Sequence, residues 1–189
     1  MRHLTLTLTL AVLGLAEGAA LAAPFKQTLN LQGVSFEVRA AGEDSTQILQ
    51  VKANRGLKAY PMVKEELSGR VIGAEVEDLN SDGRPELVVM VQSAGSGSYG
   101  SVQAWSAGPR KLEPIQLKGE LTGQQASGYM GHDSFAVVET SVVRQFPIYK
   151  TGDSNARASG GTRQIVYKMV SGPGSWSLQP VRSTDLPPP

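Results

Sequence analysis

The stretch LVVMVQSAGSGSYGSVQAWSAGP, residues 87–109, decides the fold class. Within it, Gly95, Gly97 and Gly100 spell G-x-G-x-x-G directly after an apolar run, as in a dinucleotide-binding turn. Such a turn requires a helix immediately after the glycines, so that the helix N-terminus meets the pyrophosphate. Residues 101–107 instead alternate apolar and polar side chains, which predicts a strand. No Lys-Ser/Thr pair follows the glycines either, so a P-loop is also excluded.

The rest of the sequence predicts further short strands separated by turn residues. Gly and Pro together account for 32 residues, and no segment keeps a helical apolar period over three turns. Only residues 61–69 allow a short helix. The expected strands are residues 25–31, 34–40, 46–53, 72–79, 87–93, 101–107, 134–139, 141–150, 162–170 and 175–180. This spacing predicts an all-β, single-domain antiparallel β-sandwich-like fold.

The two ends of the chain have a different composition from the middle. Residues 1–22 contain Arg2, then an apolar stretch, then the small residues Ala20-Leu21-Ala22, which fit the A-x-A cleavage pattern. We therefore expect a secretory signal peptide over residues 1–22, cleaved near Ala22, and an exported, periplasmic protein. The mature β domain is expected over residues 23–182, with a flexible Pro-rich tail over residues 183–189.

Composition limits the classes of partner. The chain has no cysteine, so no disulfide stabilises it, yet the mature chain is long enough to bury its own core. A net charge of +1 gives no electrostatic reason to expect nucleic acid or membrane surfaces as partners. Residues 144–168 contain several cations and only one acidic residue, Asp153. This excess of positive charge indicates a solvated face or a preference for an acidic partner. The cations of this basic segment are Arg144, Lys150, Arg157, Arg163 and Lys168.

The glycine-rich loop has a distinctive chemistry of its own. No charged side chain occurs between residues 87 and 109, while Ser96, Ser98 and Tyr99 offer hydroxyl groups. A narrow neutral loop with hydroxyl and amide donors suits insertion into a cleft lined by carboxylates. Hydrogen bonds to charged groups contribute roughly 1.5–3 kcal/mol each, and tyrosine is common at interface centres. The alternative is a flexible hairpin tip with Tyr99 folded onto the sheet.

Four segments together resemble a known family. They are DLNSDGRPELVVMVQSAGSGSYGSV (78–102), SGYMGHDSFAVVET (127–140), RQFPIYKTGDSNA (144–156) and GGTRQIVYK (160–168). They are similar to the periplasmic inhibitors of invertebrate-type lysozyme, the PliI family. The resemblance implies a β-sandwich-like fold, a periplasmic location, and a non-enzymatic function that needs no cofactor.

The resemblance also implies a mechanism. A loop that bears Ser and Tyr enters the active-site cleft of the lysozyme, where glycoside hydrolases carry a pair of carboxyl groups. Related inhibitors have the pattern S-G-x-x-Y, whereas this chain has Ser96-Gly97-Ser98-Tyr99, one residue shorter. The partner-binding residues implied are Ser96, Gly97 and Tyr99, with Ser98 as a further contact.

The segment GYMGHDSF contains further candidates. Tyr129 and His132 form a possible second contact loop for the partner. A hydrolase with Ser96 as nucleophile, assisted by His132 and Asp133, is a competing hypothesis. However, the sequence around Ser96 does not complete G-x-S-x-G, which requires a strand-turn-helix setting.

The segment DLNSDGRPE has the spacing of a calcium loop. Asp78, Asn80, Asp82 and Glu86 occupy positions 1, 3, 5 and 9, with Gly83 at position 6. An EF-hand requires a glutamate at position 12, where this chain has valine. The competing interpretation is a hairpin turn stabilised by local hydrogen bonds from Asx side chains. The alternative function is accordingly a calcium-binding β module in cell-surface adhesion.

Overall fold

The computed structural model describes residues 23–188, which form thirteen strands and one 3-10 turn, η1 (Gly123–Gln125). The strands are β1 (Phe25–Leu31), β2 (Val34–Gly42), β3 (Thr46–Arg55), β4 (Lys58–Ala59), β5 (Val63–Ser68), β6 (Arg70–Glu77), β7 (Glu86–Gln92), β8 (Gly100–Ala107), β9 (Leu112–Leu117), β10 (Ser134–Val138), β11 (Ser141–Pro147), β12 (Thr162–Gly172) and β13 (Ser175–Leu186). Within this part of the chain, no helix has the length and hydrophobicity needed to cross a membrane. The predicted signal peptide, residues 1–22, lies outside the described residues.

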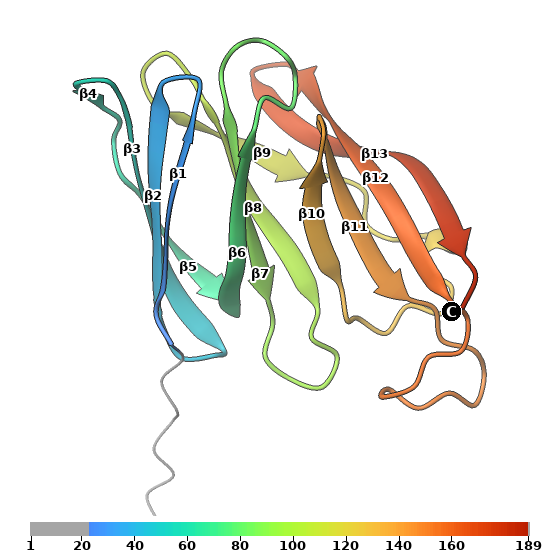
Figure 1. The fold of residues 1–189 in the computed structure, drawn as a ribbon. Helices are drawn as coiled ribbons and strands as arrows, with labels where there is room; N and C mark the ends of the chain where they lie inside the picture. Colours follow the sequence, from blue (N-terminus) through green and yellow to red (C-terminus); the bar gives the residue numbers. More distant parts are fainter. Residues whose placement is uncertain (1–22, 189) are drawn as a thin grey trace, which may run out of the picture.

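The strands form two sheets (Figure 1). Sheet 1 has five strands in the order β1-β2-β3-β4, with β5 also paired to β3. Sheet 2 has eight strands in the order β10-β11-β12-β13-β9-β8-β7-β6. Within each sheet neighbouring strands are antiparallel, except that β9 and β13 run parallel. The predicted all-β, mainly antiparallel fold is therefore confirmed.

β7 is buried on both of its faces. Leu87, Val89 and Val91 belong to core 1, between sheet 1 and the β6–β8 part of sheet 2. Val88 and Met90 belong to core 2, on the opposite face of the same strand. Because alternate side chains of a strand point to opposite faces, double burial requires apolar residues at every position. This explains why the β7 sequence is a continuous apolar run rather than an alternating one.

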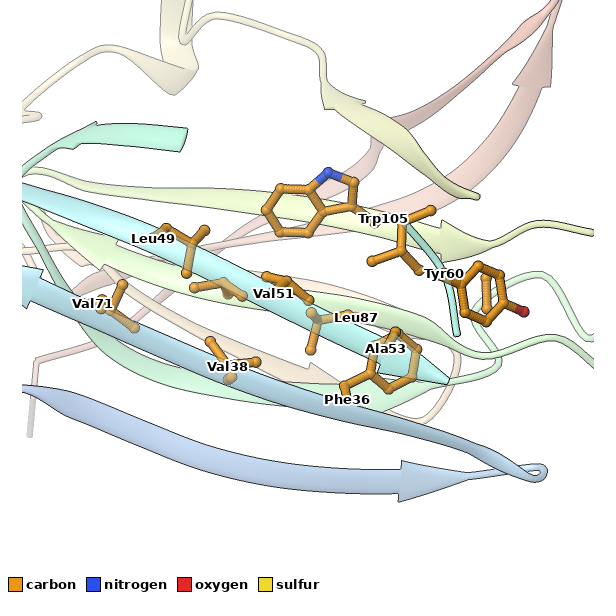
Figure 2. Packing of buried hydrophobic residues seen from close by; sticks show 14 of the residues in the cluster. Phe36, Val38, Leu49, Val51, Ala53, Tyr60, Val71, Leu87 and Trp105 are labelled. Carbon is orange, nitrogen blue, oxygen red and sulfur yellow. The ribbon is translucent and has the colours of Figure 1, made fainter. Parts of the chain in front are cut away.

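Core 1 joins the two sheets face to face (Figure 2). Phe36 from β2 and Val51 from β3 pack in the same cluster as Leu87 from β7 and Trp105 from β8. Phe36, Val51 and Leu87 are completely buried. Full burial of such a side chain contributes roughly 1.5–3 kcal/mol. The two sheets are therefore held together mainly by this apolar layer.

Sheet 2 curls so that its two edge strands approach each other. The backbone amide of Val137 in β10 donates a hydrogen bond to the Glu75 carboxylate in β6, at 3.0 Å. Core 2 fills the inside of the curl. Apart from β7, its buried residues are Leu79, Val102, Ala104, Ile115, Val142, Phe146, Ile165, Tyr167, Met169 and Leu178. The curl brings the loop after β7 close to the segments that flank β10 and β11.

The structure has a strand where the sequence of residues 61–69 allowed a short helix. Residues Val63–Ser68 form β5, which pairs antiparallel with β3. Val63, Glu65 and Leu67 alternate with exposed neighbours, and Leu67 is buried in core 1. The alternation of buried and exposed side chains therefore outweighs the helix-favouring composition of this short segment. Pairing with β3 and burial of Leu67 both stabilise the extended conformation.

The C-terminus also differs from the expected tail over residues 183–189. β13 continues to Leu186 and pairs with β12 over its whole length. The guanidinium of Arg163 in β12 donates two hydrogen bonds to Asp185, at 2.7 and 2.8 Å. A composition rich in proline and polar residues suggested a frayed end, whereas an ion pair and a long partner strand order residues 183–186.

Candidate partner-binding loop

The glycine-rich loop, residues 93–99, joins β7 to β8 at one end of the molecule (Figure 1). It closes with a hydrogen bond from the Ser93 amide to the Tyr99 carbonyl, at 2.8 Å. A second, from the Ser98 amide to the Gly95 carbonyl at 3.2 Å, forms a turn at its tip. Gly95 and Ser98 have φ of 106° and 42°, the left-handed region. The loop is therefore a compact hairpin connection. The last glycine of the G-x-G-x-x-G pattern, Gly100, begins strand β8 and not a helix.

Two other segments hold the loop by its backbone. The His132 amide donates to the Gly97 carbonyl at 2.6 Å, and the Asn155 side-chain amide donates to the Ser96 carbonyl at 2.7 Å. Gly131 has a φ of 90°, and a Cβ there would collide with the Gly97 carbonyl oxygen. Three loops, residues 93–99, 127–133 and 148–161, therefore meet at the same end of the fold.

A buried ion pair lies beneath the loop. The Arg144 guanidinium donates to Asp133 at 2.6 Å, and the two residues are only 9% and 4% exposed. The other Asp133 oxygen accepts the backbone amide of Gly100 at 2.9 Å, where the loop enters β8. Burial disfavours the Arg144 charge, but the hydrogen bond and charge of Asp133 outweigh it and raise the pKa of the guanidinium. The pair anchors the loop to β11.

Tyr129 completes this buried group. Its hydroxyl donates to Asp133 at 2.7 Å and accepts from Arg144 at 2.8 Å. Its ring meets the Tyr99 ring edge to face at 5.7 Å and the Phe146 ring at 4.7 Å. Burial, followed by the hydrogen bond to Asp133, raises the pKa of Tyr129 well above its usual range. Tyr129 therefore supports Tyr99 from below as a neutral phenol.

The outer surface of the loop carries free hydroxyl groups. Ser96 is exposed, Ser98 is half-buried, and Tyr99 is 51% exposed. Within residues 23–188, the hydroxyls of Ser96, Ser98 and Tyr99 make no hydrogen bond to the protein. The Tyr99 ring passes over Gly97, where a Cβ would come within 2.5 Å of the ring. Tyr99 is thus partly packed and partly available.

The proposed second contact loop lies beside the first, and two of its polar groups already have partners within the protein. The Tyr129 hydroxyl is bound to the buried ion pair, and the His132 ring nitrogen lies 3.3 Å from the Asn155 side-chain oxygen. Met130, between them, is 38% exposed. The structure therefore brings Tyr129 and His132 next to the loop, in positions that support it from inside.

The same contacts argue against the hydrolase hypothesis. A catalytic Ser-His-Asp arrangement needs the carboxylate to hold the histidine ring and the histidine to reach the serine hydroxyl. Here Asp133 is bound to Arg144, Tyr129 and the Gly100 amide. The His132 ring contacts Asn155 instead. The Asp133 carboxylate therefore holds the backbone at the end of the loop and does not orient the His132 ring.

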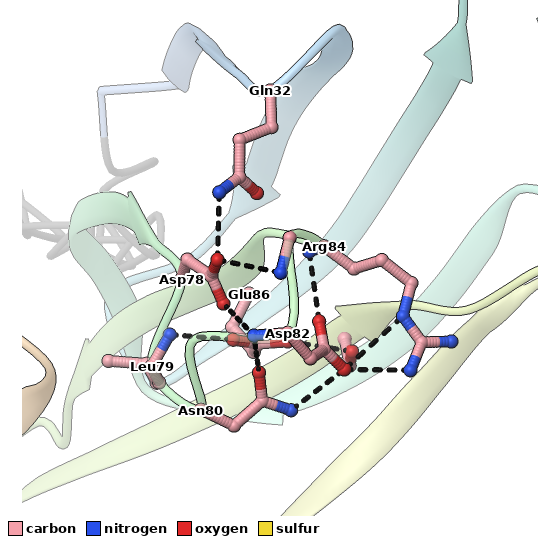
Figure 3. Close-up of polar contacts among 9 residues, drawn as sticks. Gln32, Asp78, Leu79, Asn80, Asp82, Arg84 and Glu86 are labelled. Carbon is pink, nitrogen blue, oxygen red and sulfur yellow. Dashed lines mark hydrogen bonds and ion pairs between the residues drawn. The ribbon is translucent and has the colours of Figure 1, made fainter.

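The candidate calcium residues lie at the other end of β7, in a turn whose side chains form hydrogen bonds within the turn itself (Figure 3). The two Asp78 oxygens accept the amides of Asp82 and Gly83, each at 2.9 Å. Asn80 accepts the Asp82 amide at 3.1 Å. The Arg84 guanidinium donates to Asp82 at 2.7 Å. Within residues 23–188, no cluster of three or more His, Cys, Asp or Glu residues is suited to hold a metal.

Glu86, the fourth candidate ligand, points inward and away from the other three. It is completely buried, accepting the Ser106 hydroxyl at 2.7 Å and the Leu79 amide at 2.8 Å. Burial raises the pKa of its carboxyl group to about 7, although both hydrogen bonds favour the charged form. Glu86 therefore stabilises the start of β7. The positions of all four candidate ligands support a hairpin turn stabilised by local hydrogen bonds.

Arg144 and Asn155 were not identified as site residues from the sequence. Arg144 had a usable signal, since an arginine inside the apolar strand SVVRQF requires a buried partner. Asn155 had none, because an asparagine in a polar loop is ordinary. Its contact with Ser96 spans 59 residues and depends on the curl of sheet 2.

Comparison with known proteins identifies the family. Residues 17–128 match the family model described as periplasmic lysozyme inhibitor of I-type lysozyme, PliI. The match spans more than half of the chain and includes β1 to β9 with the loop 93–99, but ends before Tyr129. No curated protein and no solved structure matches the chain. The chain belongs to the family of periplasmic lysozyme inhibitors of I-type lysozyme.

Proposed function

We propose that this protein inhibits an I-type lysozyme in the periplasm by inserting residues 93–99 into its active-site cleft. Such inhibition would protect the bacterial peptidoglycan from lysozyme of a host or predator. The observation that carries the proposal is the loop itself. It is held by backbone contacts from two other loops, while the hydroxyls of Ser96 and Tyr99 remain exposed and unused within the described residues.

The chemistry of the target supports this use of the loop. Glycoside hydrolases act with two carboxyl groups that flank the scissile bond. Hydroxyl donors from Ser96, Tyr99 and Ser98 would bind those carboxylates and occupy the place of the substrate. Hydrogen bonds to charged groups contribute roughly 1.5–3 kcal/mol each. A neutral loop also brings no negative charge into an acidic cleft.

The hydrogen bonds that anchor the loop backbone favour tight binding. Ordering a flexible loop on binding costs roughly 0.5–1.5 kcal/mol for each immobilised side chain. Here the Gly97 and Ser96 carbonyls and the Gly100 amide are already bound to the rest of the protein. The backbone of the loop therefore loses little further freedom on binding, and the ordering cost falls mainly on its side chains.

The first prediction concerns the loop hydroxyls. We expect the protein purified from the periplasm to inhibit invertebrate-type lysozyme stoichiometrically, in assays of cell-wall lysis that include chicken and goose lysozymes for comparison. Tyr99→Ala and Ser96→Ala should each weaken inhibition about tenfold or more, because each removes a hydrogen bond to a carboxylate. The N-terminal residue of the purified protein tests the predicted cleavage near Ala22.

The matched control is Ser171→Ala, which removes an exposed serine hydroxyl at the β12–β13 hairpin. This control should inhibit like the unchanged protein. Inhibition that survives both loop substitutions would keep the family function and reject the loop mechanism. Absence of inhibition against every lysozyme would reject the proposed function itself.

A further inference from the structure

We propose that residues 148–161, the connection between β11 and β12, form a further part of the lysozyme-binding surface. In this view, Lys150 and Arg157 attract acidic groups around the cleft that receives the loop 93–99. The inference rests on the proposed function and adds a partner-facing segment to it. The sequence placed Lys150 and Arg157 only in a basic segment, with a solvated face or an acidic partner as the two interpretations, and the family match ends before this connection.

Asn155 places this connection beside the inserted loop. Its side-chain amide donates to the Ser96 carbonyl at 2.7 Å, and its side-chain oxygen lies 3.3 Å from the His132 ring nitrogen. Its own carbonyl accepts the Tyr149 hydroxyl at 2.8 Å. Asn155 therefore contacts both other loops. A partner that reaches Ser96 also comes close to the residues that flank Asn155.

The connection is held in a defined shape. Its two ends pair, with the Ile148 amide donating to the Gly161 carbonyl at 2.9 Å. Inside it, the Asp153 carboxylate accepts the amides of Lys150 and Ser159, at 2.7 and 2.9 Å. Backbone bonds to this carboxylate, that of Lys150 above all, lower the pKa of Asp153. The exposed side chains are therefore presented from a fixed backbone.

Two cations of the connection face solvent without an ion pair. Lys150 and Arg157 are exposed, and neither forms a salt bridge within residues 23–188. The other cations of the basic segment have internal partners. Arg144 binds Asp133, Arg163 binds Asp185 and Lys168 donates to Thr140. Three cations of this segment therefore stabilise the fold, while Lys150 and Arg157 are available to a partner.

The charge of these two residues complements the expected partner. The catalytic carboxyl groups of a glycoside hydrolase give its cleft a local negative potential. The inserted loop itself is uncharged, so long-range attraction has to come from residues around it. Cations at the rim of an interface mainly accelerate association, and salt weakens the effect. Lys150 and Arg157 are therefore expected to act on the association rate more than on the dissociation rate.

The test compares two double charge reversals. One variant carries Lys150→Glu with Arg157→Glu. The matched control carries Arg110→Glu with Lys111→Glu, two exposed cations at the opposite end of β8 from the loop. Both variants change the net charge by the same amount, and thermal unfolding checks that both are folded. Association and dissociation rates with invertebrate-type lysozyme are measured at low and at high salt.

We expect the first variant to associate about tenfold more slowly at low salt, with a smaller difference at high salt. The control should associate within about twofold of the unchanged protein. Equal slowing in both variants would overturn the inference, because net charge alone would then explain the effect. Unchanged rates in the first variant would overturn it while leaving the proposed function intact. An unchanged protein that does not bind lysozyme at all would overturn both.

Discussion

Asp133 links the loop 93–99 to the interior of the protein. Its carboxylate accepts the Gly100 amide, the Tyr129 hydroxyl and the Arg144 guanidinium. Each of these groups is buried or half-buried, so losing one partner would leave others unsatisfied. Asp133 does not face the proposed partner. It is a positioning residue that sets where β8 begins and supports Tyr99 through Tyr129.

A prediction at the residue scale follows for Asp133→Asn. Removing one charge from a buried pair costs roughly 3–5 kcal/mol, because the remaining charge loses its partner. We therefore expect a large fall in the free energy of unfolding, measured in urea. Binding to lysozyme by the folded variant should also weaken, because the single amide oxygen of asparagine cannot accept from Arg144 and from the Gly100 and Tyr129 donors at the same time.

The control is Asp185→Asn, which removes the aspartate of the Arg163 pair at a site where Asp185 is 47% exposed. It should cost much less than Asp133→Asn and leave binding unchanged, because Asp185 is half exposed and the buried Arg163 keeps its hydrogen bonds to the Gln125 and Ser127 carbonyls. Binding is then measured again with Tyr99→Ala combined with Asp133→Asn. If Asp133 acts through the loop, its effect on affinity should shrink in that background. An equal effect with and without Tyr99 would contradict the positioning role.

At the scale of elements, the β6–β7 connection shows how a calcium-like spacing builds a turn. Asp78 and Asn80 accept amides from the turn itself, and Arg84 places a guanidinium beside Asp82. The Gln32 side chain, from the β1–β2 turn, donates to Asp78 at 2.7 Å. The oxygens that would bind a cation are thus satisfied by protein donors, and the connection joins two neighbouring hairpins.

A prediction about metal removal belongs to this element. We expect neither added calcium nor a chelator to change the thermal unfolding midpoint, measured by circular dichroism. Asp82→Ala should lower the free energy of unfolding by about 1 kcal/mol with or without calcium, since it removes local hydrogen bonds. A midpoint that rises by several degrees with calcium would contradict the turn interpretation and favour the alternative of a calcium-binding module.

At the scale of the whole molecule, the β6–β8 strands form a middle layer shared by two cores. Core 1 lies between this layer and sheet 1, and core 2 lies inside the curl of sheet 2. Glu86 begins β7 within this layer, completely buried and without a salt bridge in the described part of the chain. A buried carboxylate in such a position makes the stability of the whole fold depend on pH.

The expected dependence is a loss of stability as the pH rises. Because burial raises the pKa of Glu86 from 4.5 to about 7, the folded state binds more protons than the unfolded state between these values. The free energy of unfolding should therefore fall from pH 4.5 to pH 7, by on the order of 3 kcal/mol. Denaturant unfolding across this range measures the slope.

Glu86→Gln should flatten this dependence and stabilise the protein at pH 8. A neutral amide can still accept the Leu79 amide, and it can donate to the Ser106 hydroxyl. The exposed Glu120→Gln serves as the control and should leave the slope unchanged. A slope that persists in Glu86→Gln would assign the pH dependence to other groups.

Much of the fold could be predicted from local patterns. Most of the predicted strand segments overlap observed strands, because alternation of apolar and polar residues reports which face of a strand is buried. β4 and β9 were missed. β4 has only two residues, and Pro114 lies inside β9. For β5 the sequence allowed a short helix, because the pairing of β5 with β3 is a tertiary contact.

The sequence by itself determined the all-β class, the strand that follows Gly100, and the composition of an uncharged loop that contains several hydroxyl groups. These are local properties, set by side-chain periodicity and turn residues over a few positions. Only the tertiary structure decided that Asn155 and His132 hold the loop, that Arg144 pairs with Asp133, and that Glu86 faces inward. Those contacts join segments 7 to 59 residues apart. They form because sheet 2 curls until segments distant in the sequence meet, and no local pattern encodes that curl.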